Sequence, residues 1–210
     1  MIHNIIFDMG NVLIRWEPER FLEREGVPEE DRPLFMEEVF GSVEWVQMDR
    51  GCIPCEEGAG AMCRRLPERL QPLARKLALR WWEDHLIPME GMGDLVREVK
   101  ELGYGVYLLS NAKGDLPEYF DKIPGSECFD GKIVSADWKL LKPQPEIYQV
   151  LFREFGLKAE ECFFTDDLNI NIEGAALVGM PGAIFRGASR LRRDLIAAGV
   201  PVRPEETKNR

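Results

Sequence analysis

Carboxylate, hydroxyl and amide side chains follow directly after three short apolar runs that lie far apart in the chain. These side chains are Asp8, Ser110 with Asn111, and Asp166 with Asp167. The adjacent carboxylates of Asp166 and Asp167 repel each other unless a cation binds them. Mg²⁺ prefers oxygen ligands, and it commonly takes one or two carboxylates together with water and phosphate oxygens. If the fold brings these groups together, they form a site for magnesium and a phosphate group.

Lys142 offers the positive charge that a phosphate site needs. It precedes Pro143, a residue suited to the first turn of a helix, and apolar residues then recur at helical spacing up to Phe155. We therefore expect a helix with Pro143 in its first turn and Lys142 at its amino-terminus. Taken singly, each polar residue also has a structural interpretation as a cap, a turn residue or a solvated charge. Their joint placement after strand-like runs favours a functional site.

The apolar runs themselves indicate a parallel sheet. The first of them is β-branched or aromatic and too short for a helix, which favours a strand buried on both faces. From Gly91 onward, helical patterns alternate with short apolar runs, as in proteins of the α/β class. The expected strands lie at 5–7, 106–109, 133–134, 162–165 and 182–185. In open parallel sheets ligands bind at the carboxyl ends of the strands, so the polar residues should meet there.

The segment from residue 15 to residue 89 has a different pattern. It contains no convincing strand, and its apolar residues recur at helical spacing between prolines and glycines. We therefore expect a small helical domain at 15–89, inserted into a core domain made of residues 1–14 and 90–210. The tryptophans of the insert are expected to pack its core, with the alternative that Trp16 or Trp45 faces a ligand.

Composition and charge restrict the partners. The chain has 27 Lys plus Arg against 37 Asp plus Glu, and its net charge of −10 argues against binding to nucleic acid or to an anionic membrane. It has no run of about 18 apolar residues, and its amino-terminus lacks a basic region followed by an apolar stretch. We therefore expect neither a membrane span nor a signal peptide, and a cytoplasmic protein.

Cysteine and histidine are poor candidates for the chemistry. The five cysteines form no regular framework, and the pair Cys52 and Cys55 lacks the second pair that a zinc site needs. His3 and His85 are the only histidines, and they lie far apart in the sequence. This spacing argues against a histidine-based triad.

Four segments resemble the motifs of the haloacid dehalogenase-like superfamily, in particular its phosphatases with a helical cap inserted after the first motif. The segments are Phe7-Asp8-Met9-Gly10-Asn11-Val12-Leu13, Leu109-Ser110-Asn111, Lys142-Pro143, and Phe163-Phe164-Thr165-Asp166-Asp167 with Asn171. They occur in the family's order, and the resemblance covers nearly the whole chain. It implies a Rossmann-like three-layer α/β/α core with a parallel sheet, plus a small helical cap after the first strand.

The resemblance also implies the role of each site residue. Asp8 would be the nucleophile that forms an aspartyl-phosphate, and its carboxylate would also bind Mg²⁺. Ser110 and Lys142 would hold phosphoryl oxygens, with Asn11 and Asn111 as further phosphate-binding candidates. The backbone carbonyl of Gly10 and the carboxylates of Asp166 and Asp167 would complete the metal site, and we favour Asp167 as the direct ligand. We therefore predict a magnesium-dependent phosphatase acting on a small phosphorylated metabolite, a sugar phosphate or similar.

Position 10 departs from the family pattern. Most phosphatases of the superfamily carry a second Asp two residues after the nucleophile, as general acid for the leaving group, and this chain has Gly10. A subset of capped members resembles it in having D-x-G-N-V. The leaving oxygen must then depart as an alkoxide-like anion, or take its proton from water or from an acid of the insert, such as Glu44 or Asp49.

Two alternatives stay open at this point. A dehalogenase acting on 2-haloacids would also use an aspartate nucleophile and a helical cap. It needs no magnesium, however, and its family resembles the Asp166-Asp167 motif poorly. A non-catalytic phosphate-binding protein with the same fold is supported only by Gly10.

Overall fold

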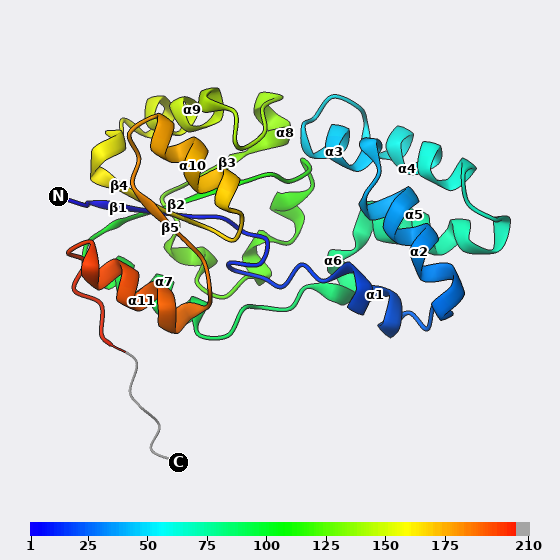
Figure 1. Ribbon diagram of the computed structural model, residues 1–210, viewed down its shortest axis with the longest axis horizontal. Coiled ribbons are helices and arrows are strands. Elements are labelled where there is room, and N and C mark those ends of the chain that lie inside the picture. Colours follow the sequence, from blue (N-terminus) through cyan, green and yellow to red (C-terminus); the bar gives the residue numbers. More distant parts are fainter. Residues whose placement is uncertain (205–210) are drawn as a thin grey trace, which may run out of the picture.

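The computed structural model describes residues 1–204, and its centre is a parallel five-stranded sheet (Figure 1). The strands lie in the order β3-β2-β1-β4-β5. They are β1 (Asn4–Phe7), β2 (Gly105–Ser110), β3 (Gly131–Val134), β4 (Cys162–Asp166) and β5 (Gly182–Ile184). Ile5, Ile6 and Phe7 are fully buried, as expected for a central strand covered on both faces. The predicted α/β class is confirmed.

The two faces of the sheet pack against different helices. Ile5 and Phe7 belong to a core with α7 (Met92–Glu101) and α11 (Ala188–Ala197). Ile6 points the other way, into a second core under α9 (Pro145–Phe155). The helix α10 (Asn169–Leu177) contributes Ala175 to that second core. This alternation of side chains along β1 produces a Rossmann-like arrangement of helices on both faces of the sheet.

The register of the sheet decides which residues share its edge. Phe7 at the end of β1 lies opposite Leu108 of β2 and Thr165 of β4. The next residue, Asp8, donates its backbone N–H to the Thr165 carbonyl at 3.0 Å. The strand ends therefore bring residue 8 beside residues 109–110 and residues 166–167.

Between β1 and α7 the structure contains helices and turns but no strand, apart from isolated bridges of Ile14 with Gly10 and Pro88. This insert holds α1 (Pro18–Arg24), α2 (Arg32–Phe35), α3 (Val43–Asp49), α4 (Cys55–Arg64), α5 (Gln71–Arg80) and α6 (Trp82–His85). In Figure 1 these helices form the half of the molecule that lies beyond one end of the sheet. None of the helices in residues 1–204 is long and apolar enough to cross a membrane.

The two connections between the insert and the sheet bond to each other. Arg15 donates its backbone N–H to the Ile87 carbonyl, and Met89 donates to the Leu13 carbonyl, both at 2.8 Å. Ile14 and Pro88 form an antiparallel bridge between them. The chain therefore leaves and re-enters the core at one place.

The helix that follows Lys142 begins later than expected. We expected Pro143 in its first turn, but α9 begins at Pro145, so that prediction is wrong. The Gln144 side chain accepts a hydrogen bond from the Leu141 N–H at 2.8 Å, and this bond closes a turn over residues 141–144. Lys142 therefore lies in a turn before the helix. The apolar spacing predicts further helices that begin at Asp94, Asn171 and Leu191, and the observed helices α7, α10 and α11 begin two or three residues earlier.

Candidate active site

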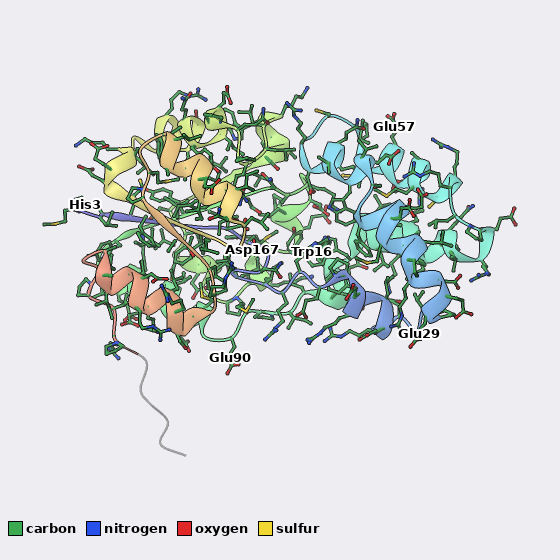
Figure 2. The ribbon with its side chains drawn as sticks, viewed as in Figure 1. His3, Trp16, Glu29, Glu57, Glu90 and Asp167 are labelled. Carbon is green, nitrogen blue, oxygen red and sulfur yellow. The ribbon has the colours of Figure 1, made fainter. Side chains whose placement is uncertain are left out.

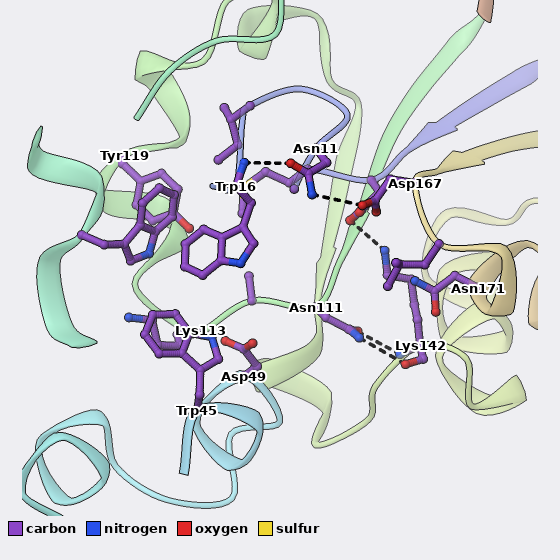
Figure 3. A pocket seen from close by; sticks show the side chains of 17 residues that line it. Asn11, Trp16, Trp45, Asp49, Asn111, Lys113, Tyr119, Lys142, Asp167 and Asn171 are labelled. Atoms are coloured by element: carbon purple, nitrogen blue, oxygen red, sulfur yellow. Dashed lines mark hydrogen bonds and ion pairs between the residues drawn. The ribbon is translucent and has the colours of Figure 1, made fainter. Parts of the chain in front are cut away.

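A cavity of about 270 Å³ lies between the carboxyl edge of the sheet and the helical insert (Figure 3). The core lines it with polar groups, which include Asp8, Gly10, Asn11, Asn111, Lys142 and Asp167. The insert lines it mainly with aromatic groups, which include Trp16, Trp45 and Trp81. Figure 2 labels Asp167 and Trp16 at the boundary of these two halves, and His3 at the far end of the sheet. Asp8, Asn111 and Asp167, which follow three different strands, therefore meet at this cavity, as expected.

Lys142 lies between two buried carboxylates. Its Nζ is 2.7 Å from Asp8 Oδ1 and 2.6 Å from Asp166 Oδ2. Burial acts to lower the pKa of Lys142, but the two carboxylates outweigh it and leave that pKa above its ordinary value. Burial raises the pKa of Asp8, and Lys142 offsets only part of this effect. A cation is therefore fixed beside Asp8, and a further cation would favour the ionised Asp8.

Asp166 and Asp167 differ in how many hydrogen bonds they accept. Asp166 is fully buried and accepts from Lys142, from the Asn171 amide at 3.0 Å and from the Leu168 N–H at 2.9 Å. Asp167 is half-buried, and the described residues give its carboxylate a single hydrogen bond, from Asn11 Nδ2 to Oδ2 at 3.1 Å. Burial raises the pKa of Asp167, and the bond from Asn11 opposes this. Asp167 therefore has an oxygen free for another partner.

The three carboxylates fit a hard cation. Oxygen atoms of Asp8, Asp166 and Asp167 all lie within 4.8 Å of one another. This spacing is costly for anions alone but suits ligands of one ion with oxygen preference. The donor set, with carboxylates only and no nitrogen or sulfur ligand, fits Mg²⁺ better than a transition metal.

Both asparagines of the predicted phosphate site hold other parts of the cavity wall. Asn111 Oδ1 accepts the Lys142 N–H at 2.8 Å, and its Nδ2 donates to the Lys142 carbonyl at 3.1 Å. Asn11 has a left-handed φ of 53°, which Asn tolerates, and its Oδ1 accepts the Trp16 N–H at 2.9 Å. Each amide thus positions a neighbour, and contact of either with phosphate stays a prediction.

Ser110 and Gly10 occupy contrasting positions. Ser110 ends β2 and is buried, and it is not among the residues of the described chain that line the cavity. Gly10 does line it, with a negative φ, and a Cβ there would meet only Trp16 Cβ at 3.9 Å. Neither backbone conformation nor crowding therefore requires glycine at position 10.

The structure adds cavity residues that sequence reasoning missed, among them Lys113 and Tyr119. Lys113 is buried, donates to the Ala78 carbonyl at 2.6 Å and lies 3.4 Å from Asp115 Oδ2. Its Nζ also lies 5.0 Å from the ring centre of Trp45. The signal that could have found Lys113 is its place just after the β2 end, two residues beyond Asn111.

The two tryptophans that could face a ligand do line the cavity, whereas the cysteine pair of the insert does not. Trp16 and Trp45 both line the cavity while also packing on each other, with ring centres 5.3 Å apart. They therefore serve the core of the insert and face the site. Cys52 and Cys55 are free thiols, the first exposed and the second half-buried. Neither is among the described residues that line the cavity.

Comparison with known proteins gives a consistent picture. The family model described as haloacid dehalogenase-like hydrolase matches residues 2–179. A sesquiterpene phosphatase, astK, of Aspergillus oryzae is 29% identical over 180 residues, which cover 84% of this chain and 86% of the relative.

Solved structures share the fold. A magnesium complex of a HAD family enzyme from Bacteroides thetaiotaomicron has a TM-score of 0.71 at 25% identity and covers 91% of this chain and 98% of that one. The L-2-haloacid dehalogenase of Xanthobacter autotrophicus has a TM-score of 0.64 at 16% identity, covering 95% and 84%. At that identity the likeness concerns the fold alone.

Proposed function

Since this chain belongs to the haloacid dehalogenase-like hydrolases, we propose that it is a magnesium-dependent phosphatase acting through an aspartyl-phosphate on Asp8. The observation that carries the proposal is Lys142, whose Nζ lies 2.7 Å from Asp8 and 2.6 Å from Asp166 beside a third carboxylate. A relative named as a phosphatase supports the same reaction class.

The residues of the core divide the work of phosphoryl transfer. Asp8 is the nucleophile, and a carboxylate attacks a phosphate dianion only when positive charge cancels the repulsion. Lys142 supplies one such charge, and Asn111 holds its backbone in place through both polar groups. Ser110, the last residue of β2, and Asn11, in the loop after β1, are proposed to bind phosphoryl oxygens. Water then attacks the phosphorus of the aspartyl-phosphate and releases phosphate.

Asp8, the Gly10 carbonyl and Asp167 would bind the metal directly. Asp166 would complete the group of carboxylates without direct contact with the ion. We favour Asp167 over Asp166 as the direct ligand because Asp166 already accepts bonds from Lys142, Asn171 and Leu168. When bound there, Mg²⁺ supplies further positive charge next to the transferring phosphoryl oxygens. The magnesium complex of the Bacteroides enzyme supports this choice of ion.

The substrate we propose is a small phosphomonoester, such as a sugar phosphate. The helical insert at 15–89 would act as a cap, since it closes the cavity from the side opposite the sheet (Figure 3). The volume of about 270 Å³ accommodates a phosphate with a small organic group and excludes a folded phosphoprotein. Trp16, Trp45 and Trp81 favour an organic group with an apolar face.

Dehalogenation is the less favoured reaction. A dehalogenase of this fold resembles the chain in its aspartate and its helical insert, but three carboxylates within 4.8 Å have no use in it. They would be a source of repulsion without a cation. A non-catalytic role is opposed by Lys142, which is fixed against the nucleophile.

The proposal is tested by assaying phosphate release from a panel of phosphorylated metabolites and from 4-nitrophenyl phosphate, with Mg²⁺ and with excess chelator. We expect Asp8→Asn to abolish turnover, because it keeps the shape and removes the nucleophilic charge. The matched control is Asp94→Asn on α7, whose side chain is 86% exposed. Equal rates for Asp8→Asn and the wild type, or full activity in chelator, would contradict the proposal.

A further inference from the structure

The leaving group of the proposed reaction lacks an obvious proton source. An oxygen that departs from phosphorus takes the bonding electron pair, and a basic oxygen leaves slowly unless it is protonated. Gly10 has no side chain to provide a proton, although the space for one exists beside Trp16. Two acids of the insert are candidates, and both lie on α3, with Glu44 near its start and Asp49 at its end.

Glu44 is committed to another contact. It accepts two hydrogen bonds from Arg65, Nη1 to Oε1 and Nη2 to Oε2, both at 2.8 Å. This two-point contact with Arg65 holds the pKa of Glu44 below its ordinary value, so the group is ionised. Glu44 is also not among the cavity-lining residues of the described chain. It cannot deliver a proton to the site.

Asp49 lines the same cavity as Asp8 and Lys142. In the close view its carboxyl group lies at the wall between Trp45 and Asn111 (Figure 3). The cavity therefore has the carboxylates of Asp8 and Asp167 on the core side and the carboxyl group of Asp49 on the opposite wall. A substrate bound to Asp8 by its phosphorus places the rest of its atoms toward that wall.

The end of α3 is fastened to the core close to the reacting strand end. The Ser135 hydroxyl donates to the Asp49 carbonyl and accepts the Ala112 N–H at 2.9 Å. Arg50 Nε donates to the Lys139 carbonyl at 3.1 Å. Ala112 follows Asn111, so the backbone of Asp49 is connected to the segment that positions Lys142. This connection holds the backbone of Asp49 against the core segment beside the site.

The surroundings keep Asp49 protonated at neutral pH. Burial raises the pKa of its carboxyl group to about 8. Lys113 and a hydrogen bond from Trp45 act to lower the pKa, and Asp115 acts to raise it. Tyr119 also lines this wall, as a neutral group. Lys113 Nζ also forms an ion pair with Asp115 Oδ2 at 3.4 Å, so its positive charge interacts with both acids.

We propose that Asp49 is the general acid and base of this site, in place of a carboxyl group at position 10; the inference rests on the proposed phosphatase function. When Asp8 attacks phosphorus, the bond to the leaving oxygen breaks and the Asp49 carboxyl group gives its proton to that oxygen. The products of the step are an alcohol, the aspartyl-phosphate and ionised Asp49. Asp49 then takes a proton from the water that attacks the aspartyl-phosphate, which restores both residues and releases phosphate.

The test compares two aryl phosphates that differ in the basicity of the leaving group. 4-Nitrophenolate is weakly basic and leaves readily without a proton. Phenolate is more basic, so its departure depends more strongly on protonation of the leaving oxygen. In single-turnover measurements, Asp49→Asn should lower the rate for phenyl phosphate by about 10²- to 10⁴-fold and that for 4-nitrophenyl phosphate by less than about tenfold. Glu44→Gln on the same helix is the matched control and should leave both rates unchanged.

Two further measurements extend the test. In the wild type the rate for phenyl phosphate should fall above a pH of about 8, where Asp49 loses its proton, while the rate for 4-nitrophenyl phosphate should fall less. Asp49→Asn should lack this difference. Adding Gly10→Asp to Asp49→Asn should raise the phenyl phosphate rate again, because a carboxyl group returns near the leaving oxygen.

The outcomes separate this proposal from the phosphatase function itself. If the wild type hydrolyses 4-nitrophenyl phosphate and Asp8→Asn does not, the phosphatase function holds regardless of Asp49. A folded Asp49→Asn variant that loses both substrates equally, or neither, would then overturn the role of Asp49. If the variant does not fold, identical pH profiles of the wild type for the two substrates would overturn it.

Discussion

The side chain of Asn111 bonds both backbone polar groups of Lys142, accepting from its N–H at 2.8 Å and donating to its carbonyl at 3.1 Å. The two residues come from segments 31 positions apart in sequence. One leaves strand β2, and the other lies in the turn before helix α9. The position of the lysine ammonium group relative to Asp8 therefore depends on an amide at the end of another strand.

We expect Asn111→Ala to lower kcat/KM by about 10- to 100-fold, because Lys142 loses two hydrogen bonds, each contributing about 1 kcal/mol. The assay is magnesium-dependent release of phosphate from 4-nitrophenyl phosphate. Asn169→Ala, which removes an exposed amide that bonds Glu173 on α10, is the matched control. Equal activity of the two variants would show that Asn111 does not position the lysine.

Lys142→Met should destabilise the protein as well as inactivate it. The change leaves Asp8 and Asp166 buried without their common cation, and breaking a buried ion pair costs about 3 to 5 kcal/mol. Urea denaturation without metal measures the loss in the free energy of unfolding. Added Mg²⁺ should restore more stability to the variant than to the wild type. An unchanged unfolding free energy in Lys142→Met would contradict this view of the pair.

Asp167→Asn and Asp166→Asn should differ in effect. Asp167 has a free carboxylate oxygen, so its amide variant should bind Mg²⁺ at least about tenfold more weakly and keep the fold. Asp166 accepts bonds from Lys142, Asn171 and Leu168, so its variant should lose stability first. Calorimetric titration with Mg²⁺ and thermal melting separate the two effects. Tighter metal binding in Asp167→Asn than in Asp166→Asn would reverse our assignment of the direct ligand.

The pKa of Asp49 also predicts how stability depends on pH. The carboxyl group keeps its proton up to about pH 8 in the folded chain, against an ordinary pKa of 3.8. Between these values the folded state binds more protons than the unfolded state, so this group lowers stability as pH rises, by up to about 1.4 kcal/mol per pH unit. Asp49→Asn should remove that dependence. Denaturant unfolding of both proteins between pH 5 and pH 8 measures it, and parallel curves would contradict the raised pKa.

The gathering of the acids at one edge follows from the sequence because it requires only that the strands before them run parallel in one sheet. Asp8 and the pair Asp166 and Asp167 each follow a buried run, and parallel strands end at a common edge. The start of α9 was less determined, since Pro143 and Pro145 both suit a first helical turn. The Gln144 side chain, which bonds the Leu141 N–H, decides between them.

The choice between Glu44 and Asp49 could not be made from sequence. Both are acids on one helix, and they differ only through partners brought by folding. Arg65 neutralises Glu44 from a position 21 residues away, and Lys113 reaches the Ala78 carbonyl across 35 residues. Contacts of this length depend on packing that no local pattern encodes.

The paired connections at Ile14 and Pro88 bring the two ends of the insert together at one place beside β1. Two backbone hydrogen bonds hold these ends together. They offset the entropy cost of closing a long insertion between β1 and α7. The register of β1 against β2 and β4 is set by pairing within the sheet, so we expect it to survive changes in the length of the insert. A chimera that joins another cap at this junction would inherit the reacting aspartate from one parent and the shape of the substrate chamber from the other. The proposed nucleophile Asp8 and the aromatic wall that would select the substrate therefore lie in separate stretches of the chain, whereas the proposed acid Asp49 lies in the same stretch as that wall.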